Sequence, residues 1–83
     1  MVSFNSQHLK SIIAEILGVP EDHIKAGAGM DSIDLWDSFA VVNMVVSIEQ
    51  ETGLSVSPDE LENFTTFDGI LQLLASKGVV FDQ

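Results

Sequence analysis

The sequence has no cysteine, no arginine and no tyrosine, and it sets three lysines against thirteen acidic residues. Without cysteine, neither a disulfide framework nor a thiolate metal site can form. The formal net charge of −10 excludes nucleic acid as a partner, because Lys and Arg must neutralise its phosphates. An anionic membrane surface would repel the chain for the same reason. Partners attracted by charge should therefore carry basic surfaces, unless the acids serve only solubility.

Long apolar runs are also missing. No stretch approaches the roughly 20 residues that cross a bilayer, and the first residues lack the basic and apolar regions of a secretory signal. We therefore expect a soluble, cytoplasmic protein. Its 83 residues make a single domain, 1–83, that buries only roughly 60% of its unfolded surface. A hydrophobic content of 46% is typical of a small globular domain and not of a disordered chain.

The spacing of apolar residues predicts an all-α fold. We expect a small bundle of three main helices and one short helix, with a long loop between the first and second helices. Asn5 or Ser6 is the expected N-cap of the first helix, and Gly18 the residue at which it ends. Its apolar side chains recur on one face: Leu9, Ile12, Ile13, Ile16 and Leu17.

The loop from Glu21 to Trp36 is long for a compact domain, and such loops are usually functional or contain a helical turn. We expect that turn at residues 20–24, with Pro20 at the first helical position. Four apolar residues are expected to hold the loop to the core: Ile24, Met30, Ile33 and Leu35.

The second helix is predicted from Asp37 or Ser38 to Glu51, with Gly53 beyond its end. Its many β-branched residues would also suit a strand, but its length and polar tail favour a helix. Five residues are assigned to or beside the face toward the core: Val42, Val45 and Ile48, flanked by Val41 and Met44.

Two further helices are predicted in the last third of the chain. Residues 57–60, Ser-Pro-Asp-Glu, match a capping box and open a short helix whose Leu61 and Phe64 face inward. The threonine pair at 65–66 caps the last helix, which ends at Gly78 with Lys77 near its C-terminal dipole.

A candidate site lies where the long loop meets the second helix, in the sequence Trp36-Asp37-Ser38-Phe39. Unpaired backbone N–H groups and the helix dipole favour an anion at a helix N-terminus, so a phosphodiester on Ser38 would be stabilised there. On local sequence alone, a plain N-cap is the commoner role of such residues.

The residues around this site and further along the chain resemble those of a known protein family. Asp37-Ser38-Phe39 resembles the Asp-Ser-Leu signature of the acyl carrier protein family, which includes stand-alone acyl, peptidyl and D-alanyl carriers. The resemblance continues through residues 48–56, 57–61 and 64–67 and covers nearly the whole chain. It implies a helical carrier protein that is not an enzyme, with 4'-phosphopantetheine attached covalently to Ser38.

A second serine, in Asp31-Ser32-Ile33, also fits the tripeptide. In the family, the modified serine begins the second helix, eleven residues before the first acid of a Leu-Glu-Glu-like segment. Ser38 precedes Glu49 by this spacing, whereas Ser32 does not and lacks a helical apolar pattern after it. We therefore assign the attachment to Ser38.

The resemblance also implies the partners. A separate phosphopantetheinyl transferase would attach the arm from coenzyme A, and Asp37 would assist its magnesium ion; the isolated protein is expected to hold no metal. The arm would carry acyl or aminoacyl groups as thioesters between activating and transferring enzymes, in fatty acid, polyketide or nonribosomal peptide biosynthesis. Nothing in the sequence requires more than a monomer. Trp36 is expected to be a partly buried loop anchor that could also flank the arm.

The second helix departs from the family in one respect. Fatty-acid carriers are usually acidic soon after the serine, but here the expected outward positions are Phe39, Asn43 and Val46, with an acid first at Glu49. With Asp37, these residues are our predicted partner-binding surface. We expect a specialised carrier whose docking is more apolar; the alternative is an unmodified, carrier-like interaction module.

Other chemistry is weakly supported. His8 and His23 have no ligand spacing to an acid, and Asp31, Asp34 and Asp37 do not follow the spacing of an EF-hand. A hydrolase built from Ser38 and His23 would lack an oxyanion hole or nucleophile elbow. We therefore predict no catalytic residues.

Overall fold

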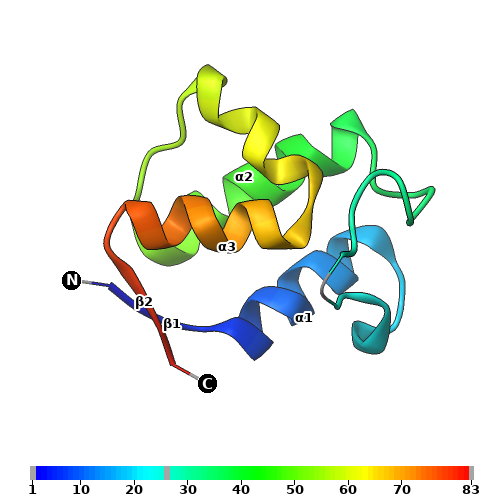
Figure 1. Cartoon of the computed structure of the whole chain (residues 1–83), viewed down its shortest axis with the longest axis horizontal. Helices are drawn as coiled ribbons and strands as arrows, with labels where there is room; N and C mark the ends of the chain where they lie inside the picture. Colours follow the sequence, from blue (N-terminus) through cyan, green and yellow to red (C-terminus); the bar gives the residue numbers. More distant parts are fainter. Residues whose placement is uncertain (1, 26, 83) are drawn as a thin grey trace.

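The computed structural model describes residues 2–25 and 27–82. It confirms a small helical bundle of three main helices and one short helix, with a long connection between the first two (Figure 1). No helix in these two ranges is long and apolar enough to cross a bilayer. The elements follow in the order β1 (Val2–Asn5), α1 (Ser6–Leu17), η1 (Glu21–His23), α2 (Ser38–Thr52), η2 (Pro58–Thr65), α3 (Phe67–Ser76) and β2 (Val79–Asp82).

The two strands are a feature that the sequence analysis did not predict. β1 and β2 pair in parallel, from Val2 opposite Val79 to Asn5 opposite Asp82, and so bring the two end segments side by side (Figure 1). Val2–Asn5 alternates apolar and polar residues over the minimum length for a strand signal, but Val79–Asp82 does not alternate. The pair therefore adds a small sheet to the predicted bundle.

Local capping chemistry sets where the helices begin and end. The Asn5 side chain accepts a hydrogen bond from the backbone N–H of Gln7 at 2.7 Å, so Asn5, and not Ser6, is the N-cap of α1. Asp37 caps α2 in the same way. Both helices end at glycines in the left-handed conformation, Gly18 and Gly53. The predicted boundaries of these two helices therefore hold to within one or two residues.

One apolar core joins the three main helices. Its fully buried side chains come from all three main helices, the long connection and η2. They are Leu9 and Ile13 of α1, Ile24 and Trp36 of the connection, Met44 and Ile48 of α2, Phe64 of η2, and Ile70 and Leu74 of α3. Burying such side chains in a single cluster provides the main driving force for folding.

The predicted inner face of α2 is wrong at one position. Val42 is 54% exposed, whereas Val41, Met44 and Ile48 are buried and Val45 is partly buried. The inner face is therefore centred on Met44 and rotated away from Val42. α2 carries apolar residues on nearly all sides, so periodicity alone does not select the buried face.

The apolar residues of the long connection divide into two groups. Ile24 is buried and Ile33 partly buried, as predicted, but Met30 and Leu35 are exposed. Leu61, predicted to face inward from the short helix, is also exposed. Apolar residues outside a regular periodic pattern are often exposed, because a folded chain lacks enough polar surface to cover itself. Their identity alone did not predict their burial.

The connection is fastened to the start of α3. The N–H of Met30 donates to the carbonyl oxygen of Thr65 at 2.9 Å, and the N–H of Phe67 donates to that of Ala28 at 2.9 Å. Gly29, which lies between these contacts, forms an isolated bridge with Thr66. A Cβ atom at Gly29 would lie 2.5 Å from the Thr65 carbonyl oxygen, so glycine is required here for close backbone approach.

We therefore expect Gly29→Ala to destabilise the domain by about 1–3 kcal/mol, the usual cost of forcing extra atoms into a packed site. The measurement is chemical denaturation followed by far-UV circular dichroism. Asp31→Ala, an exposed change in the same loop, is the control and should stay within about 0.5 kcal/mol of wild type. Equal stability of the two variants would contradict the close approach.

Candidate functional site

Ser38 is the first residue of α2, and its side chain is exposed. Its hydroxyl makes no hydrogen bond within the described ranges, so its oxygen is open to a reagent from solvent. The first N–H groups of a helix, here those of Ser38 and Phe39, have no partner within the helix itself. Together with the helix dipole, they favour a negatively charged group on the serine oxygen. The local geometry therefore fits a phosphodiester.

Asp37 caps the N-terminus of α2. Its Oδ1 accepts the backbone N–H of Ala40 at 2.9 Å, and its own carbonyl oxygen accepts the N–H of Val41 at 2.9 Å. The residue itself is exposed. No group of three or more His, Cys, Asp or Glu side chains among the described residues could hold a metal ion. A magnesium ion at Asp37 would therefore need ligands from another molecule.

Ser32 lies in a different setting. Its Oγ accepts the N–H of Gly29 at 3.1 Å and lies 3.3 Å from the Gly29 carbonyl oxygen, to which it can donate. The hydroxyl is thus part of a turn in the long connection, and Ser32 does not begin a helix. The two serines thus differ in the hydrogen bonds of their hydroxyl groups and in their position relative to a helix.

An exposed apolar face begins next to Ser38. Phe39 is 76% exposed and Val46 47% exposed, as predicted, whereas Asn43 is half-buried. Val42 belongs with Phe39 and Val46, because the three stand at helical spacing along α2. We call Phe39, Val42 and Val46 the apolar stripe. Sequence reasoning missed Val42 because it had assigned that residue to the core.

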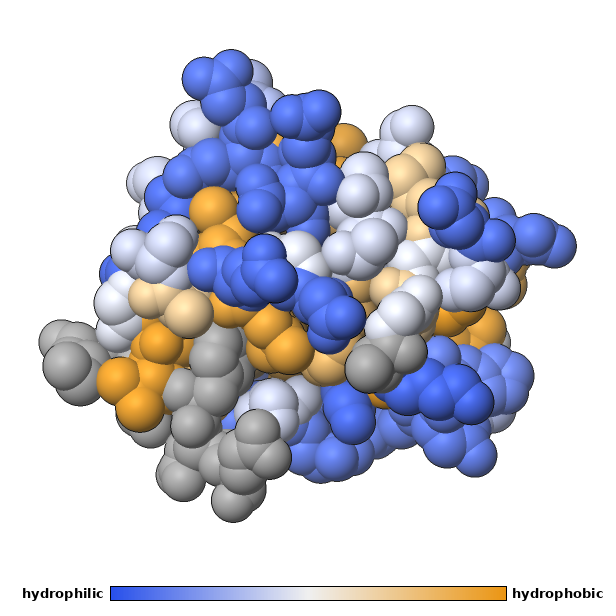
Figure 2. Space-filling model, in the orientation of Figure 1, coloured by the Kyte–Doolittle hydropathy of each residue, from blue (hydrophilic) through white to orange (hydrophobic). Residues whose placement is uncertain are grey.

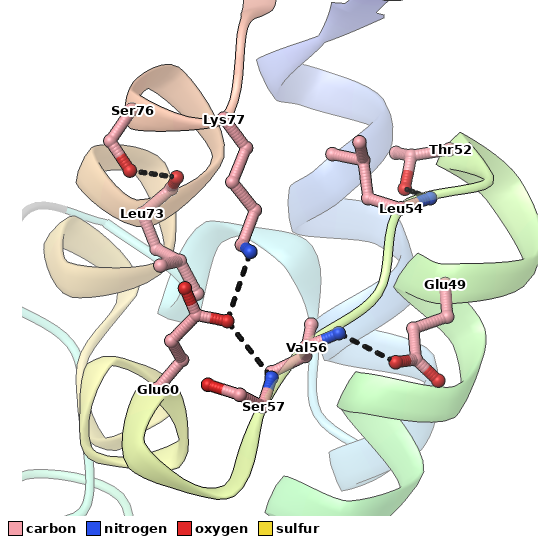
Figure 3. Close-up of polar contacts among 9 residues, drawn as sticks. All are labelled: Glu49, Thr52, Leu54, Val56, Ser57, Glu60, Leu73, Ser76 and Lys77. Carbon is pink, nitrogen blue, oxygen red and sulfur yellow. Dashed lines mark hydrogen bonds and ion pairs between the residues drawn. The ribbon is translucent and has the colours of Figure 1, made fainter.

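Glu49, the predicted acidic contact, is used within the fold. It is half-buried, and its Oε2 accepts the backbone N–H of Val56 at 2.8 Å (Figure 3). Nearby, Thr52 Oγ1 donates to the Ile48 carbonyl oxygen at 2.7 Å and accepts from the N–H of Leu54 at 3.2 Å. The two side chains fix the path of the chain as it leaves α2. The Glu49 carboxylate is thus less free for a partner than the sequence suggested.

A second carboxylate organises the start of η2. Glu60 Oε1 accepts the backbone N–H of Ser57 at 2.9 Å, as the capping box predicts, and lies 2.9 Å from Lys77 Nζ at the end of α3 (Figure 3). The Ser57 N–H, and then the Lys77 ammonium, lower the pKa of Glu60 below its ordinary value.

Neither of the two histidines makes a hydrogen bond with the Ser38 hydroxyl. His8 Nε2 is 2.9 Å from Glu51 Oε1, which links the start of α1 to the end of α2, and its ring meets that of Phe4 edge-on. His23 is exposed in η1. The Ser38 hydroxyl forms no hydrogen bond with His23 or any other described residue. Neither histidine therefore activates the serine in this arrangement.

Comparison with known proteins agrees with this geometry. Residues 7–74 match the family described as "Phosphopantetheine attachment site". The chain is similar to the acyl carrier protein of Petrotoga mobilis, with 31% identity over 78 residues, 93% of this chain and 91% of the relative. It is also similar to that of Bdellovibrio bacteriovorus, with 34% identity over 71 residues, 84% of this chain and 90% of the relative.

These matches first define the class: a carrier domain with covalently attached 4'-phosphopantetheine and without catalytic activity of its own. Within that class, the chain belongs to the acyl carrier protein family. Such carriers work with a modifying transferase and with biosynthetic enzymes.

The lowered pKa of Glu60 predicts part of the response to acid. Its stabilising effect is complete above the unfolded-state pKa, roughly 4.3, and is lost as the pH falls through the lower folded-state pKa. We therefore expect the urea midpoint of Glu60→Gln to fall less steeply than that of wild type below about pH 5. Glu62→Gln, an exposed carboxyl of the same helix, is the control and should keep the wild-type slope. Identical slopes for Glu60→Gln and wild type would contradict the prediction.

Proposed function

We propose that Ser38 carries the 4'-phosphopantetheine arm. The observation that supports this most is the exposed serine hydroxyl, without a hydrogen bond to any described residue, at the first position of α2. In the proposed reaction, the Ser38 oxygen attacks the coenzyme A phosphorus that bears the pantetheine. The Oγ–P bond forms, the bridging P–O bond of the pyrophosphate breaks, and adenosine 3',5'-bisphosphate leaves. The hydroxyl proton passes to a base of the transferase.

Asp37 would take part in the same reaction. Its carboxylate lies beside the reacting serine in sequence, and only one of its oxygens is used by the N-cap bond to Ala40. The other can bind a magnesium ion whose remaining ligands come from the transferase and coenzyme A. The capping role and the magnesium role are therefore compatible.

The cargo would be an acyl or aminoacyl group held as a thioester on the arm, in a specialised biosynthetic pathway. The apolar stripe next to Ser38 supports specialised docking, because desolvated apolar side chains contribute strongly to protein interfaces. Asn43, at its border, and Glu49 would add polar contacts. The net charge of −10 would draw in enzymes with basic surfaces before these short-range contacts form. We further propose a monomeric, cytoplasmic carrier formed by the single domain 1–83.

Intact mass tests the attachment directly. Incubation of wild type with coenzyme A, magnesium and a broad-specificity transferase should add one phosphopantetheine group. Ser38→Ala should gain no mass, whereas Ser32→Ala, the matched serine control, should be loaded like wild type. Asp37→Asn keeps an N-cap residue but loses the carboxylate, so it should fold normally and load at least tenfold more slowly.

No mass gain in wild type would favour the second candidate, an unmodified interaction module, for which the exposed apolar stripe also provides a surface. Mass gain that persists in Ser38→Ala would place the arm elsewhere.

The apolar stripe gives a second test, with the transferase as the docking partner. Phe39→Ala should lower kcat/KM for loading about tenfold or more, because a central aromatic side chain commonly contributes over 1 kcal/mol to an interface. Val46→Ala should lower it less. Val80→Ala is the matched control, because Val80 is as exposed as Val46 but lies on β2, and it should load normally.

Glu49→Gln retains an acceptor for the Val56 N–H and removes only the charge. If Glu49→Gln slows loading while Phe39→Ala does not, docking depends on charge near Ser38 and the role of the stripe is refuted.

A further inference from the structure

A surface pocket of about 360 Å³ lies between η1 and the long connection. Its volume falls within the range of small-molecule sites. The described residues that line it are His23, Lys25, Gly27, Ala28, Ser32 and Ile33. None of them belongs to the apolar stripe or to the first turn of α2, so the pocket is a separate feature of the surface.

The chemistry of the pocket combines apolar walls with hydrogen-bond donors. Ala28 and Ile33 supply the apolar part, while the Lys25 ammonium and an N–H of the His23 ring can donate. Lys25 is the lysine left without an ion pair or ring contact in the described ranges. Lys77 pairs with Glu60, and Lys10 lies 5.9 Å from the centre of the Phe67 ring.

The surroundings limit the kind of ligand. Asp22 and Asp31 are sequence neighbours of lining residues, and the whole chain has a net charge of −10, so a strongly anionic ligand is disfavoured. A neutral ligand with carbonyl acceptors and some apolar surface fits better. The distal half of phosphopantetheine has this composition, with two amide groups separated by short methylene segments.

We propose that this pocket docks the distal, amide-bearing half of the phosphopantetheine arm; the inference rests on the attachment at Ser38 proposed above. Donors of the pocket would bind the amide carbonyls, and Ile33 and Ala28 would contact the methylene groups.

The arm is long enough to approach Ile33, the lining residue nearest to Ser38 in the sequence. Ser38 follows Ile33 by five residues, which span at most about 18 Å when fully extended. The actual separation is shorter, because the N–H of Trp36 bonds to the Ile33 carbonyl oxygen at 3.0 Å and folds this segment into turns. The arm has about fourteen bonds, which at roughly 1.2 Å each reach about 17 Å. Figure 1 shows the connection and the first turn of α2 at the same end of the molecule.

The pocket can bind the tethered arm with low affinity and still be occupied for much of the time. A short flexible tether gives its end an effective concentration in the millimolar range, so a site with a Kd of about 1 mM would be occupied roughly half of the time. A partner enzyme could then withdraw the arm easily. The apolar stripe also lies beside Ser38, but it presents no polar side chain to the amides.

Amide NMR spectra of the unmodified and loaded protein test the proposal. Loading should shift the amides of Gly27, Ala28, Ser32 and Ile33 in addition to those around Ser38. Free pantetheine, added at millimolar concentration to the unmodified protein, should shift the same four amides. Lys25→Ala should reduce these shifts several-fold. Asp22→Ala, an exposed change in η1 at a residue that does not line the pocket, is the control and should retain them.

The two measurements, on the loaded protein and with free pantetheine, separate this inference from the attachment itself. Loading confirmed by mass, with shifts confined to α2 and no response of the pocket to free pantetheine, would overturn the docking site but not the attachment. A response of the pocket to free pantetheine, without any mass gain, would support the pocket and refute the attachment at Ser38.

Discussion

The position of the candidate site at the start of α2 depends on the buried side chain of Trp36. Its indole is only 1% exposed, and its Nε1–H donates to the carbonyl oxygen of Phe64 at 2.9 Å. An indole N–H buried without a partner would be costly, so this bond favours one placement of the side chain. The chain leaves the core directly after it, at Asp37, and α2 begins there with Ser38 outside and Ala40 inside. Trp36 therefore acts from within the core and is not a surface that could flank the arm.

The exposed start of α2 differs in polarity from the surfaces of η1 and η2. Figure 2 shows hydrophilic residues over η2 at the top of the view and over η1 at the lower right. The exposed side of α2 begins instead with the apolar stripe. The Lys77 ammonium contacts Glu60 and the His8 ring contacts Glu51, each an acid of another element. Under the proposed function, long-range attraction would come from the acids as a whole, while close contact near Ser38 would be apolar.

Helix ends were predictable from sequence because capping depends on residue types within a few positions, as at Asn5, Asp37 and the capping box of η2. The inner face of α2 was not predictable from sequence, because a helix that is apolar on nearly all sides can turn several faces to the core. Packing against α1 and η2 determines which face is buried. The β1–β2 pair joins opposite ends of the chain, so no local signal could reveal it. For the candidate site, spacing selected Ser38 over Ser32. Only the folded structure shows that Glu49 accepts the N–H of Val56 and that Val42 joins the apolar stripe.

The parallel pairing of the strands has a mechanical consequence. Two parallel strands need a crossover between them, and here the crossover is the entire helical bundle. Val2 lies at one end of the paired ribbon and Asp82 at the other. A force that pulls these two residues apart along the strands would therefore slide β1 past β2 and load all their hydrogen bonds at once, instead of opening them one by one. This short strand pair is thus oriented to resist tension before any helix is strained.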